Sequence, residues 1–330
     1  MKIFDSIVTI CTALLVLFIV LNAAAGYEVF VSFELIQLLP SFDFIFWVLA
    51  SMSLVLVIAA GGKRIALLIV FFILSIQLIF RHSDHSFDLS VEHSSKDTLK
   101  VLSLNVGQFS NDTAVVNQCI HLIRSEKADI VCLQEFGLYY KWPDVESVAS
   151  DFARRTGFKY YDFSPKQGNI FGTAIFSKHE ITQIDTVFQL LSHTNEAKLY
   201  QLDVNGISIT VANIHLQSYN LFSSRDSLSL SSIRKAIAMR NEQVKMIIKT
   251  QSDIMLGDFN ASPGTIVHNL LCDEYIDVQG SFGNAFSPTL QVFPTRLDYV
   301  FVGSRFVVNS SYLNARFPSD HKALVAKIAI

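Results

Sequence analysis

The sequence predicts an α/β domain with mixed β-sheets, preceded by a bundle of three membrane-spanning helices. Two observations support this class. Residues 1–80 hold three long apolar runs, whereas the rest of the 330-residue chain alternates short apolar segments with amphipathic ones. Helix-length stretches separate some of the apolar segments and short turns separate others, so parallel and antiparallel pairing should both occur.

The three apolar runs have the length and composition of membrane spans. A bilayer core takes about 20 apolar residues in a helix, and we predict helices at about 3–25, 42–60 and 64–80. A buried soluble hairpin is the alternative interpretation. The few charged residues of this region lie at its ends and in its loops: Lys2, Asp5, Glu28, Glu34, Asp43, Lys63 and Arg64. Such sparse charge favours the membrane.

The basic residues predict the orientation of these helices. Lys and Arg accumulate in cytoplasmic loops, and Lys2 and the Lys63-Arg64 pair lie on one side of a three-pass chain. Residues 26–43, on the other side, hold no Lys or Arg, although Arg81 argues weakly against this orientation. We therefore expect an integral protein of the cell or inner membrane, with its following domain on the extracytoplasmic side.

A polar stretch, residues 81–97, follows the third run and is expected to be a linker to a catalytic domain at 98–330. Its histidines are irregularly spaced, which favours a solvated tether over a metal site. The first apolar run has an alternative interpretation as a signal peptide cleaved near residues 23–25, and such cleavage would leave the topology of the rest unchanged.

Composition limits the classes of function. The four cysteines have no paired spacing, so neither a disulfide framework nor a metal knuckle is indicated. Three of the 26 basic and four of the 29 acidic residues lie in the first 80 residues, which leaves residues 81–330 with a formal charge of −2. Proteins that grip many nucleic-acid phosphates usually carry a basic excess, and this domain does not.

The expected elements of the domain follow in chain order. Period-two and continuous apolar segments predict strands at 99–107, 129–137, 159–165, 172–178, 181–190, 197–206, 207–218, 252–260, 296–303 and 321–330. Helical spacing of apolar residues predicts helices at 114–128, 144–157 and 231–250. The Asn205-Gly206 pair is a strong hairpin signal. No internal repeat is evident.

Polar side chains end most of these strands. They are Asn105, Glu135, His215, Asp258 with Asn260, Asp298, and Asp320 with His321. Each has an ordinary structural explanation, as a turn former, a helix cap or a satisfied core residue. Loops at the ends of sheets are where functional sites are assembled, however, and this many coincidences favour a site.

This set of residues suits one kind of chemistry. A carboxylate such as Glu135 binds a hard Mg²⁺ ion with few protein ligands and several waters. An aspartate beside a histidine can hold the imidazole in one tautomer, and amides donate to phosphoryl oxygens. Hydrolysis of a phosphate ester needs a positioned water, a base and a cation. No serine elbow, glycine-rich phosphate loop or zinc motif competes with this hypothesis.

Seven segments in order resemble one known family. The segments LSLNVG, VCLQEFG, FGTAIFSK, ANIHLQS, MLGDFNASP, RLDYVFVG and SDH are similar to those of the endonuclease/exonuclease/phosphatase superfamily, the DNase I-like fold, and the chain resembles a membrane-anchored bacterial-type member. The resemblance covers about residues 97–330. It implies a four-layered α/β sandwich with two mixed sheets.

The resemblance also implies a metal and a water site. Glu135 would be the principal ligand of Mg²⁺ (or Mn²⁺), with Asn105 and Asp320 near the metal and its waters. Asp258 would orient or deprotonate the attacking water. Asn260 would bind the phosphate.

Further roles follow from the same resemblance. His321 would stabilise the transition state, oriented by Asp298, and His215 would lie near the leaving group. Arg240 and Gln243, three apart on the helix at 231–250, resemble substrate residues of some phosphatase and lipase branches, or else form an exposed helix face.

Two features depart from the family or add to it. DNase I-type members have a Glu, and abasic-site nucleases a Tyr, just before the strand at 172–178, where this chain has Ile170, Phe171 and Gly172. The Glu or Tyr that those members place there is therefore not at these positions, and the resemblance leaves the partner of His215 open. The Ser-rich stretch 218–232 is either a substrate-entry lid or a disordered insertion.

Together these features predict a membrane-anchored, metal-dependent phosphoesterase that acts on phosphodiester bonds, in the first place a nuclease. The alternatives are a phospholipid or sphingomyelin-type headgroup phosphodiesterase, an inositol-phosphate phosphatase, and an inactive interaction module on the same fold. The expected partners are a phosphate-ester substrate, nucleic acid or lipid, and the bilayer. No protein partner is predicted.

Overall fold

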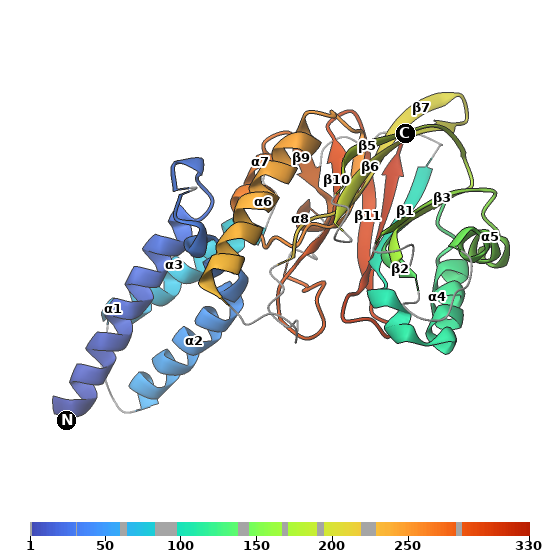
Figure 1. Ribbon diagram of the computed structural model, residues 1–330. Coiled ribbons are helices and arrows are strands. Elements are labelled where there is room, and N and C mark those ends of the chain that lie inside the picture. The colour runs from blue at the N-terminus through green and yellow to red at the C-terminus, as the bar shows by residue number, and fades with distance from the viewer. Residues whose placement is uncertain are drawn as a thin grey trace.

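The structure is a computed structural model that describes residues 2–30, 32–59, 65–82, 98–137, 145–166, 171–189, 195–218, 229–281 and 286–330. Figure 1 shows a bundle of three helices that extends from one side of a sandwich of sheets and helices. Most of the linker expected at 81–97, the core of the Ser-rich stretch (219–228) and Ile170 lie outside the described residues.

Three apolar helices form the N-terminal bundle. They are α1 (Lys2–Ala24), α2 (Asp43–Ala59) and α3 (Ile65–His82), with short helical turns η1 (Glu28–Phe30) and η2 (Glu34–Phe42) between the first two. Three candidate spans, Ser6–Ala24, Leu35–Val55 and Ile65–His82, are long and apolar enough to cross a membrane. The third helix continues through Arg81 and His82, which the sequence analysis gave to the linker.

Two six-stranded sheets form the rest of the chain. Sheet A has the order β11-β12-β1-β2-β4-β3 and sheet B the order β5-β6-β7-β8-β10-β9. The strands of sheet A are β1 (Thr98–Asn105), β2 (Ile130–Gly137), β3 (Tyr160–Lys166), β4 (Phe171–Ser177), β11 (Val307–Asn314) and β12 (Ala323–Ala329). Those of sheet B are β5 (Glu180–Gln189), β6 (Glu196–Val204), β7 (Ile207–His215), β8 (Ile254–Asp258), β9 (Tyr275–Asp277) and β10 (Asp298–Gly303). Among the described strands, the pairs β1·β2 and β7·β8 are parallel and the other pairs are antiparallel, so both sheets are mixed.

Helices cover the outer face of each sheet. They are η3 (Gly107–Asn111), α4 (Thr113–Glu126), α5 (Val145–Thr156), α6 (Leu230–Ile248) and α7 (Ile266–Cys272), whereas Val278 of the short α8 (Val278–Ser281) packs in the cluster between the sheets. One apolar cluster packs α4 and α5 on sheet A, a second fills the space between the sheets, and a third packs α6 and α7 on sheet B. The expected four-layered sandwich is confirmed.

Local sequence explains several boundaries. Asp112 caps α4 by accepting a hydrogen bond from the Ala114 amide, and Ser229 caps α6 in the same way from Ser232. Asn205 and Gly206 both have positive φ and join β6 to β7, as the hairpin signal predicted. Strands β9 and β11 and helices α7 and α8 were not expected, because their apolar runs are short or interrupted by polar residues.

Candidate active site

Parallel pairing brings the predicted polar residues together at one edge of the sandwich. Within sheet A, Asn105 ends β1 beside β2, which carries Glu135. Within sheet B, His215 is the register partner of Asp258, which in turn pairs with Asp298 on the antiparallel strand β10. The carboxyl ends of parallel strands meet at one edge, and the start of an antiparallel neighbour reaches the same edge.

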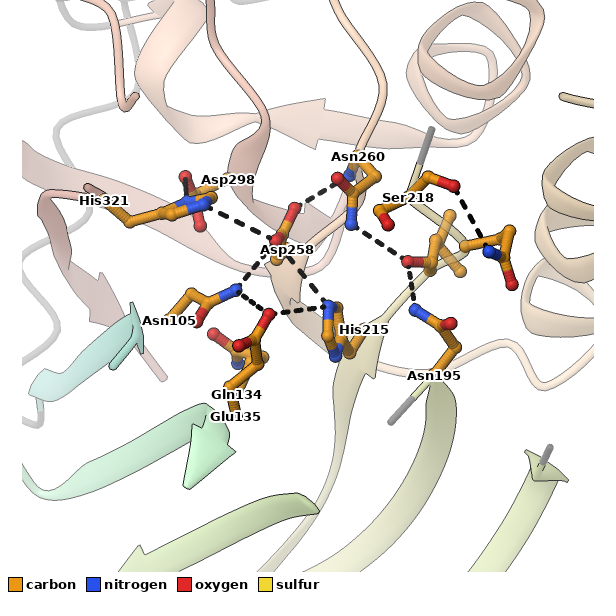
Figure 2. Close-up of polar contacts among 12 residues, drawn as sticks. Asn105, Gln134, Glu135, Asn195, His215, Ser218, Asp258, Asn260, Asp298 and His321 are labelled. Carbon is orange, nitrogen blue, oxygen red and sulfur yellow. Dashed lines mark hydrogen bonds and ion pairs between the residues drawn. The ribbon is translucent and has the colours of Figure 1, made fainter. Parts of the chain in front are cut away.

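Hydrogen bonds join the two sheets at this edge. The Asn105 amide donates to Asp258 Oδ2 at 3.0 Å and lies 3.4 Å from Glu135 Oε1, as Figure 2 shows. Beneath them, buried Gln134 donates to Asn213 Oδ1 at 2.8 Å from one sheet to the other. These cross-sheet bonds hold the two halves of the site at a set distance.

Glu135 sits in an unusual backbone conformation. Its φ is +50°, and the pairing of β2 with β4 shifts register between Leu133 and Phe136. A bulge of this kind re-aims a side chain, and a positive φ in a non-glycine residue stores strain that is common at functional sites. The Glu135 side chain is 27% exposed, whereas Asp258 beside it is almost fully buried.

His321, Asp298 and Asp258 form a buried row. His321 Nδ1 lies 2.8 Å from Asp298 Oδ2, and His321 Nε2 lies 3.9 Å from Asp258 Oδ2. Burial lowers the pKa of His321, but the charges of Asp298 and Asp258 outweigh it and raise this pKa to about 10. The imidazole is therefore a cation at neutral pH, suited to stabilise negative charge.

Asp258 lies at the centre of the site. Burial raises the pKa of Asp258, and the charge of Asp298 adds to this rise, while His321, His215 and the Asn105 amide oppose it. A carboxylate with a raised pKa is a stronger base than an exposed one. Asp258 can accept a proton from a water at this edge.

His215 faces both carboxylates from the other side. Its Nε2 lies 3.9 Å from Glu135 Oε1 and 3.8 Å from Asp258 Oδ2. The acid or tyrosine that related enzymes place before β4 is absent at Phe171 and Gly172. The position of His215 nonetheless agrees with a role near the reacting phosphate.

Asn260 is held by the loop that follows β8. Its φ is +49°, its amide N donates to Asp258 Oδ1 at 2.9 Å, and its side chain donates to the carbonyl of Leu216 at 3.0 Å. Asn195 donates to the same carbonyl at 2.6 Å. In Figure 2 the Asn260 side chain lies beside Asp258, on the side away from Glu135.

Arg240 and Gln243 are buried next to the loop that bears Asn260. Arg240 donates to the carbonyl of Asn260, and Gln243 accepts from the Gln217 amide at 3.0 Å. They do not form the exposed helix face that was the alternative. Their contacts support the loop that bears Asn260, and their expected substrate role stays a prediction.

The oxygen donors at this edge fit a hard divalent cation. Asn105 and Glu135 lie within 3.4 Å of each other, and the exposed Asp320 follows Ser319, whose hydroxyl donates to the Asn105 carbonyl at 2.8 Å. Carboxylate and amide oxygens that are open to water are the ligands Mg²⁺ prefers. These three residues are the ones that would hold it, and their ligand role stays a prediction.

A second acidic and histidine group also lies within ligating range. One ligand atom each from Asp258, Asp298 and His321 falls within 4.8 Å of the others. In this trio the imidazole already pairs with Asp298 and all three side chains are buried. We therefore treat it as a hydrogen-bonded row and retain Glu135 as the metal ligand.

Sequence reasoning missed several supporting residues. Gln108 lies 3.4 Å from Glu135 Oε2, and the Thr289 hydroxyl accepts from the Asp298 amide at 3.1 Å. Gln134 and Asn213 bridge the sheets. The alternation of the strands offered a signal for the last two, because a polar side chain at an inward position is unusual.

Comparisons with known proteins identify the family of this chain. Residues 102–321 match the model of the Endonuclease/Exonuclease/phosphatase family. A comparison with curated proteins found no significant match.

Solved structures share the fold at low sequence identity. An endonuclease/exonuclease/phosphatase from Beutenbergia cavernae DSM 12333 is 17% identical, with a TM-score of 0.55 over 71% of this chain and 72% of that one. The human Nocturnin catalytic domain with bound sulfate anion is 20% identical, with a TM-score of 0.54 over 71% and 94%. D. rerio TDP2 complexed with single strand DNA product is 15% identical, with a TM-score of 0.55 over 71% and 100%.

The family model covers two thirds of the sequence and contains every predicted catalytic and metal residue. The chain belongs to the endonuclease/exonuclease/phosphatase family.

Proposed function

We propose that this protein is a membrane-anchored, Mg²⁺- or Mn²⁺-dependent phosphoesterase that hydrolyses phosphodiester bonds by attack of an activated water. One observation carries the proposal: a water-accessible carboxylate and a buried row of acids and histidine lie at one sheet edge. Glu135 is partly exposed, whereas Asp258, Asp298 and His321 are buried beside it.

Each side chain has a task in this reaction. Asp258 takes the proton of the attacking water, because its raised pKa makes it the stronger base. Cationic His321, held by Asp298, stabilises the charge that develops on the phosphate. Asn260 binds a phosphoryl oxygen, and His215 protonates or polarises the leaving group.

The metal would be held by Glu135, Asn105 and Asp320. A divalent ion there supplies positive charge to the non-bridging phosphoryl oxygens. The remaining stabilisation comes from the donors and charges of the chain itself.

Nucleic acid is the first substrate class to consider. A likeness in fold to TDP2 complexed with single strand DNA product supports it. The formal charge of −2 on residues 81–330 counts against a grip on many phosphates.

A lipid headgroup is the second substrate class, and a specific contact favours it. Phe293, in the loop before β10, packs edge-on against Phe42, the last residue of η2 just before α2, with ring centroids 5.6 Å apart. The site of a soluble phosphoesterase needs no such proximity to membrane helices. An inositol phosphate, whether free or as a lipid headgroup, is a further candidate substrate of the same kind.

The inactive-module alternative is the least supported. A copy that had lost activity would be expected to lose some of its catalytic groups. Here the inferred groups gather around Asp258: Asn105 and Asn260 donate hydrogen bonds to it, and a ring nitrogen of His215 and of His321 lies within 3.9 Å of it.

We further propose that the protein lies in the cell or inner membrane with its catalytic domain outside the cytoplasm. The three candidate spans and the placement of Lys2, Lys63 and Arg64 support this topology. Protease treatment of intact cells should remove the domain, whereas a protected domain would reverse the orientation.

Hydrolysis of bis-p-nitrophenyl phosphate by the full-length protein in detergent tests the reaction. We expect turnover with Mg²⁺ or Mn²⁺, and a loss of about 100-fold or more in His321→Ala. His121→Ala is the matched control, because this exposed histidine lies on α4. Equal activity in the His321 variant, or no turnover with any divalent ion, would exclude the proposed mechanism.

A further inference from the structure

The loop before β10 contacts both the membrane helices and the catalytic residues. We call residues 286–293 the rim loop. His82, the last residue of α3, stacks on Phe286 with ring centroids 5.5 Å apart, and Phe42 contacts Phe293 as described. In Figure 1 the chain between α8 and β10 accordingly lies beside the ends of α2 and α3. The rim loop is thus at the level where these helices leave the apolar core of a bilayer.

The other side of the rim loop is bonded to the active site. Leu290 forms a β-bridge with His321, and the Gln291 amide N donates to the Asp320 carbonyl at 2.6 Å. The Gln291 side chain donates to the Ser319 carbonyl at 2.7 Å. The rim loop therefore lies between the ends of the membrane helices and His321.

The junction between anchor and domain is built from specific contacts. Arg81 forms a buried ion pair with Asp43 at 2.8 Å and donates to the Asn22 carbonyl at 2.8 Å, which ties the same ends of α1, α2 and α3 together. The Ser41 hydroxyl lies 2.7 Å from that of Ser262, in the loop that follows Asn260. These contacts hold the domain close to the ends of the helices.

Two exposed apolar side chains project from the rim loop. Val292 is 70% exposed and Phe286 is 49% exposed. The connection between α1 and η2 exposes more at the same end of the bundle, namely Tyr27, Val29, Phe30 and Phe33. Aromatic and apolar residues that flank membrane helices prefer the bilayer interface. Exposure of this group of apolar side chains to water would be unfavourable.

We propose that the rim loop lies in the headgroup layer of the bilayer, and that the active site takes its phosphodiester from a lipid of that membrane. The substrate assignment rests on the proposed function. The occupant of the apolar surface is the bilayer, because the surface is continuous with the membrane helices through Phe42 and His82. The formal charge of −2 on residues 81–330 agrees with a substrate that the membrane delivers and that needs no basic groove.

The chemistry balances with water as the only co-reactant. The water oxygen bonds to phosphorus, one ester P–O bond breaks, and Asp258 takes a proton from the water. The leaving oxygen takes a proton and departs as an alcohol, while the other product keeps the phosphate as a monoester. One of the two products remains in the bilayer and the other enters solution.

The test of membrane contact does not depend on catalysis. Val292→Trp in full-length protein, reconstituted in phosphatidylcholine vesicles that contain brominated phosphatidylcholine, should be quenched beyond the wild-type signal. Ile207→Trp is the matched control, because Ile207 is 41% exposed and begins β7 at the end opposite His215. Val292→Trp quenched no more than Ile207→Trp would overturn the membrane contact.

The substrate test offers lipid, DNA and bis-p-nitrophenyl phosphate to the same proteoliposomes. We expect release of the water-soluble headgroup from phosphatidylcholine or sphingomyelin in the vesicles, with little cleavage of single-stranded or duplex DNA. Val292→Glu should lower lipid hydrolysis about tenfold, which corresponds to losing the burial of one valine side chain, and should leave bis-p-nitrophenyl phosphate hydrolysis unchanged. Ile207→Glu should change neither rate.

The other outcomes distinguish the lipid assignment, the role of the rim loop and the phosphoesterase function from one another. Cleavage of DNA but not of lipid would overturn the lipid assignment and leave the phosphoesterase function standing. Equal lipid hydrolysis in Val292→Glu and wild type would overturn the role of the rim loop. Failure to hydrolyse even bis-p-nitrophenyl phosphate would overturn the proposed function and the substrate assignment with it, while the quenching result would still decide the membrane contact.

Discussion

Asn105 on sheet A donates a 3.0 Å hydrogen bond to Asp258 on sheet B. The bond joins a proposed metal ligand to the proposed general base across the gap between two sheets. The register of each sheet brings one partner to this edge, and the packing of the sheets brings the two together.

Replacing Asn105 should impair catalysis more than folding. Asn105→Ala removes a hydrogen bond to a charged group, worth about 1.5–3 kcal/mol, and a proposed metal donor. We expect kcat to fall roughly 10- to 150-fold, measured with bis-p-nitrophenyl phosphate. Asn309→Ala, at an exposed position on β11, is the control and should retain full activity. Wild-type kcat in Asn105→Ala would contradict the assignment.

Asp298→Asn should lower kcat with little change in KM. Asp298 contacts His321 and acts through it, so the substitution removes the charge that holds the imidazole as a cation. A loss of about 100-fold or more in kcat is expected for a group that stabilises the transition state. Steady-state kinetics separate this from a binding defect, in which KM would rise while kcat stayed the same.

Metal removal should abolish activity reversibly. Chelation with EDTA is expected to stop hydrolysis, and added Mg²⁺ or Mn²⁺ should restore it. Glu135→Gln should weaken Mn²⁺ binding at least about tenfold, measured by electron paramagnetic resonance of free Mn²⁺. Glu274→Gln, at an exposed position after α7, should bind like wild type. Unchanged Mn²⁺ affinity in Glu135→Gln would move the metal to another ligand set.

Gly264→Ala should disturb the junction between anchor and domain. Its φ is +82°, and an added Cβ would lie 1.9 Å from Arg81 Nε. Gly157→Ala is the matched control, because its φ is +86° and an added Cβ there meets nothing within 4 Å. Both variants carry the backbone strain of about 1 kcal/mol. Only Gly264→Ala should lower the thermal midpoint by clearly more than that strain explains, as differential scanning fluorimetry in detergent would measure.

Acid should weaken the fold through Asp277. Burial would raise the pKa of Asp277, but the charges and hydrogen bonds of Arg296 and His268 outweigh it and hold this pKa well below its ordinary value. A carboxyl group whose pKa is lower in the folded state stabilises the protein above its unfolded pKa, and this stabilisation is lost as pH falls below that value. The ion pair with Arg296 is fully buried.

The substitution Asp277→Asn tests whether the stabilisation by Asp277 is lost as pH falls. At pH 7 it leaves Arg296 buried without its charge partner, which should cost about 3–5 kcal/mol. The difference in thermal midpoint between wild type and Asp277→Asn should narrow as pH falls from 5 toward 3. A difference that stays constant over this range would show that folding does not lower the pKa of Asp277.

The sequence by itself determined the classes of structure and the chemical inventory. Apolar runs of bilayer length specify three helices whatever follows them, because hydrophobic length is a local property. Alternating segments specify strands, and Asn205-Gly206 specifies its hairpin, since few residues accept the required positive φ. The short elements β9, β11, α7 and α8 were not predicted, because short apolar runs interrupted by polar residues show too little periodicity.

Ordered motifs also pointed to the catalytic residues, but their distances belong to the tertiary structure. Asn105 and Asp258 are 153 positions apart, and the local sequence of neither segment indicates that they are in contact. The strain at Glu135 likewise comes from pairing with β4, and the burial of Arg240 comes from the packing of α6 under the loop at Asn260.

The position of the site relative to the three apolar helices follows from tertiary contacts. The sequence placed a linker between the two, which allows any arrangement. The contacts of Phe42 with Phe293 and of Ser41 with Ser262 bring the rim of the site to the ends of the helices. Such contacts join residues more than 200 positions apart, and they form only once both sheets have packed and placed these loops on one surface.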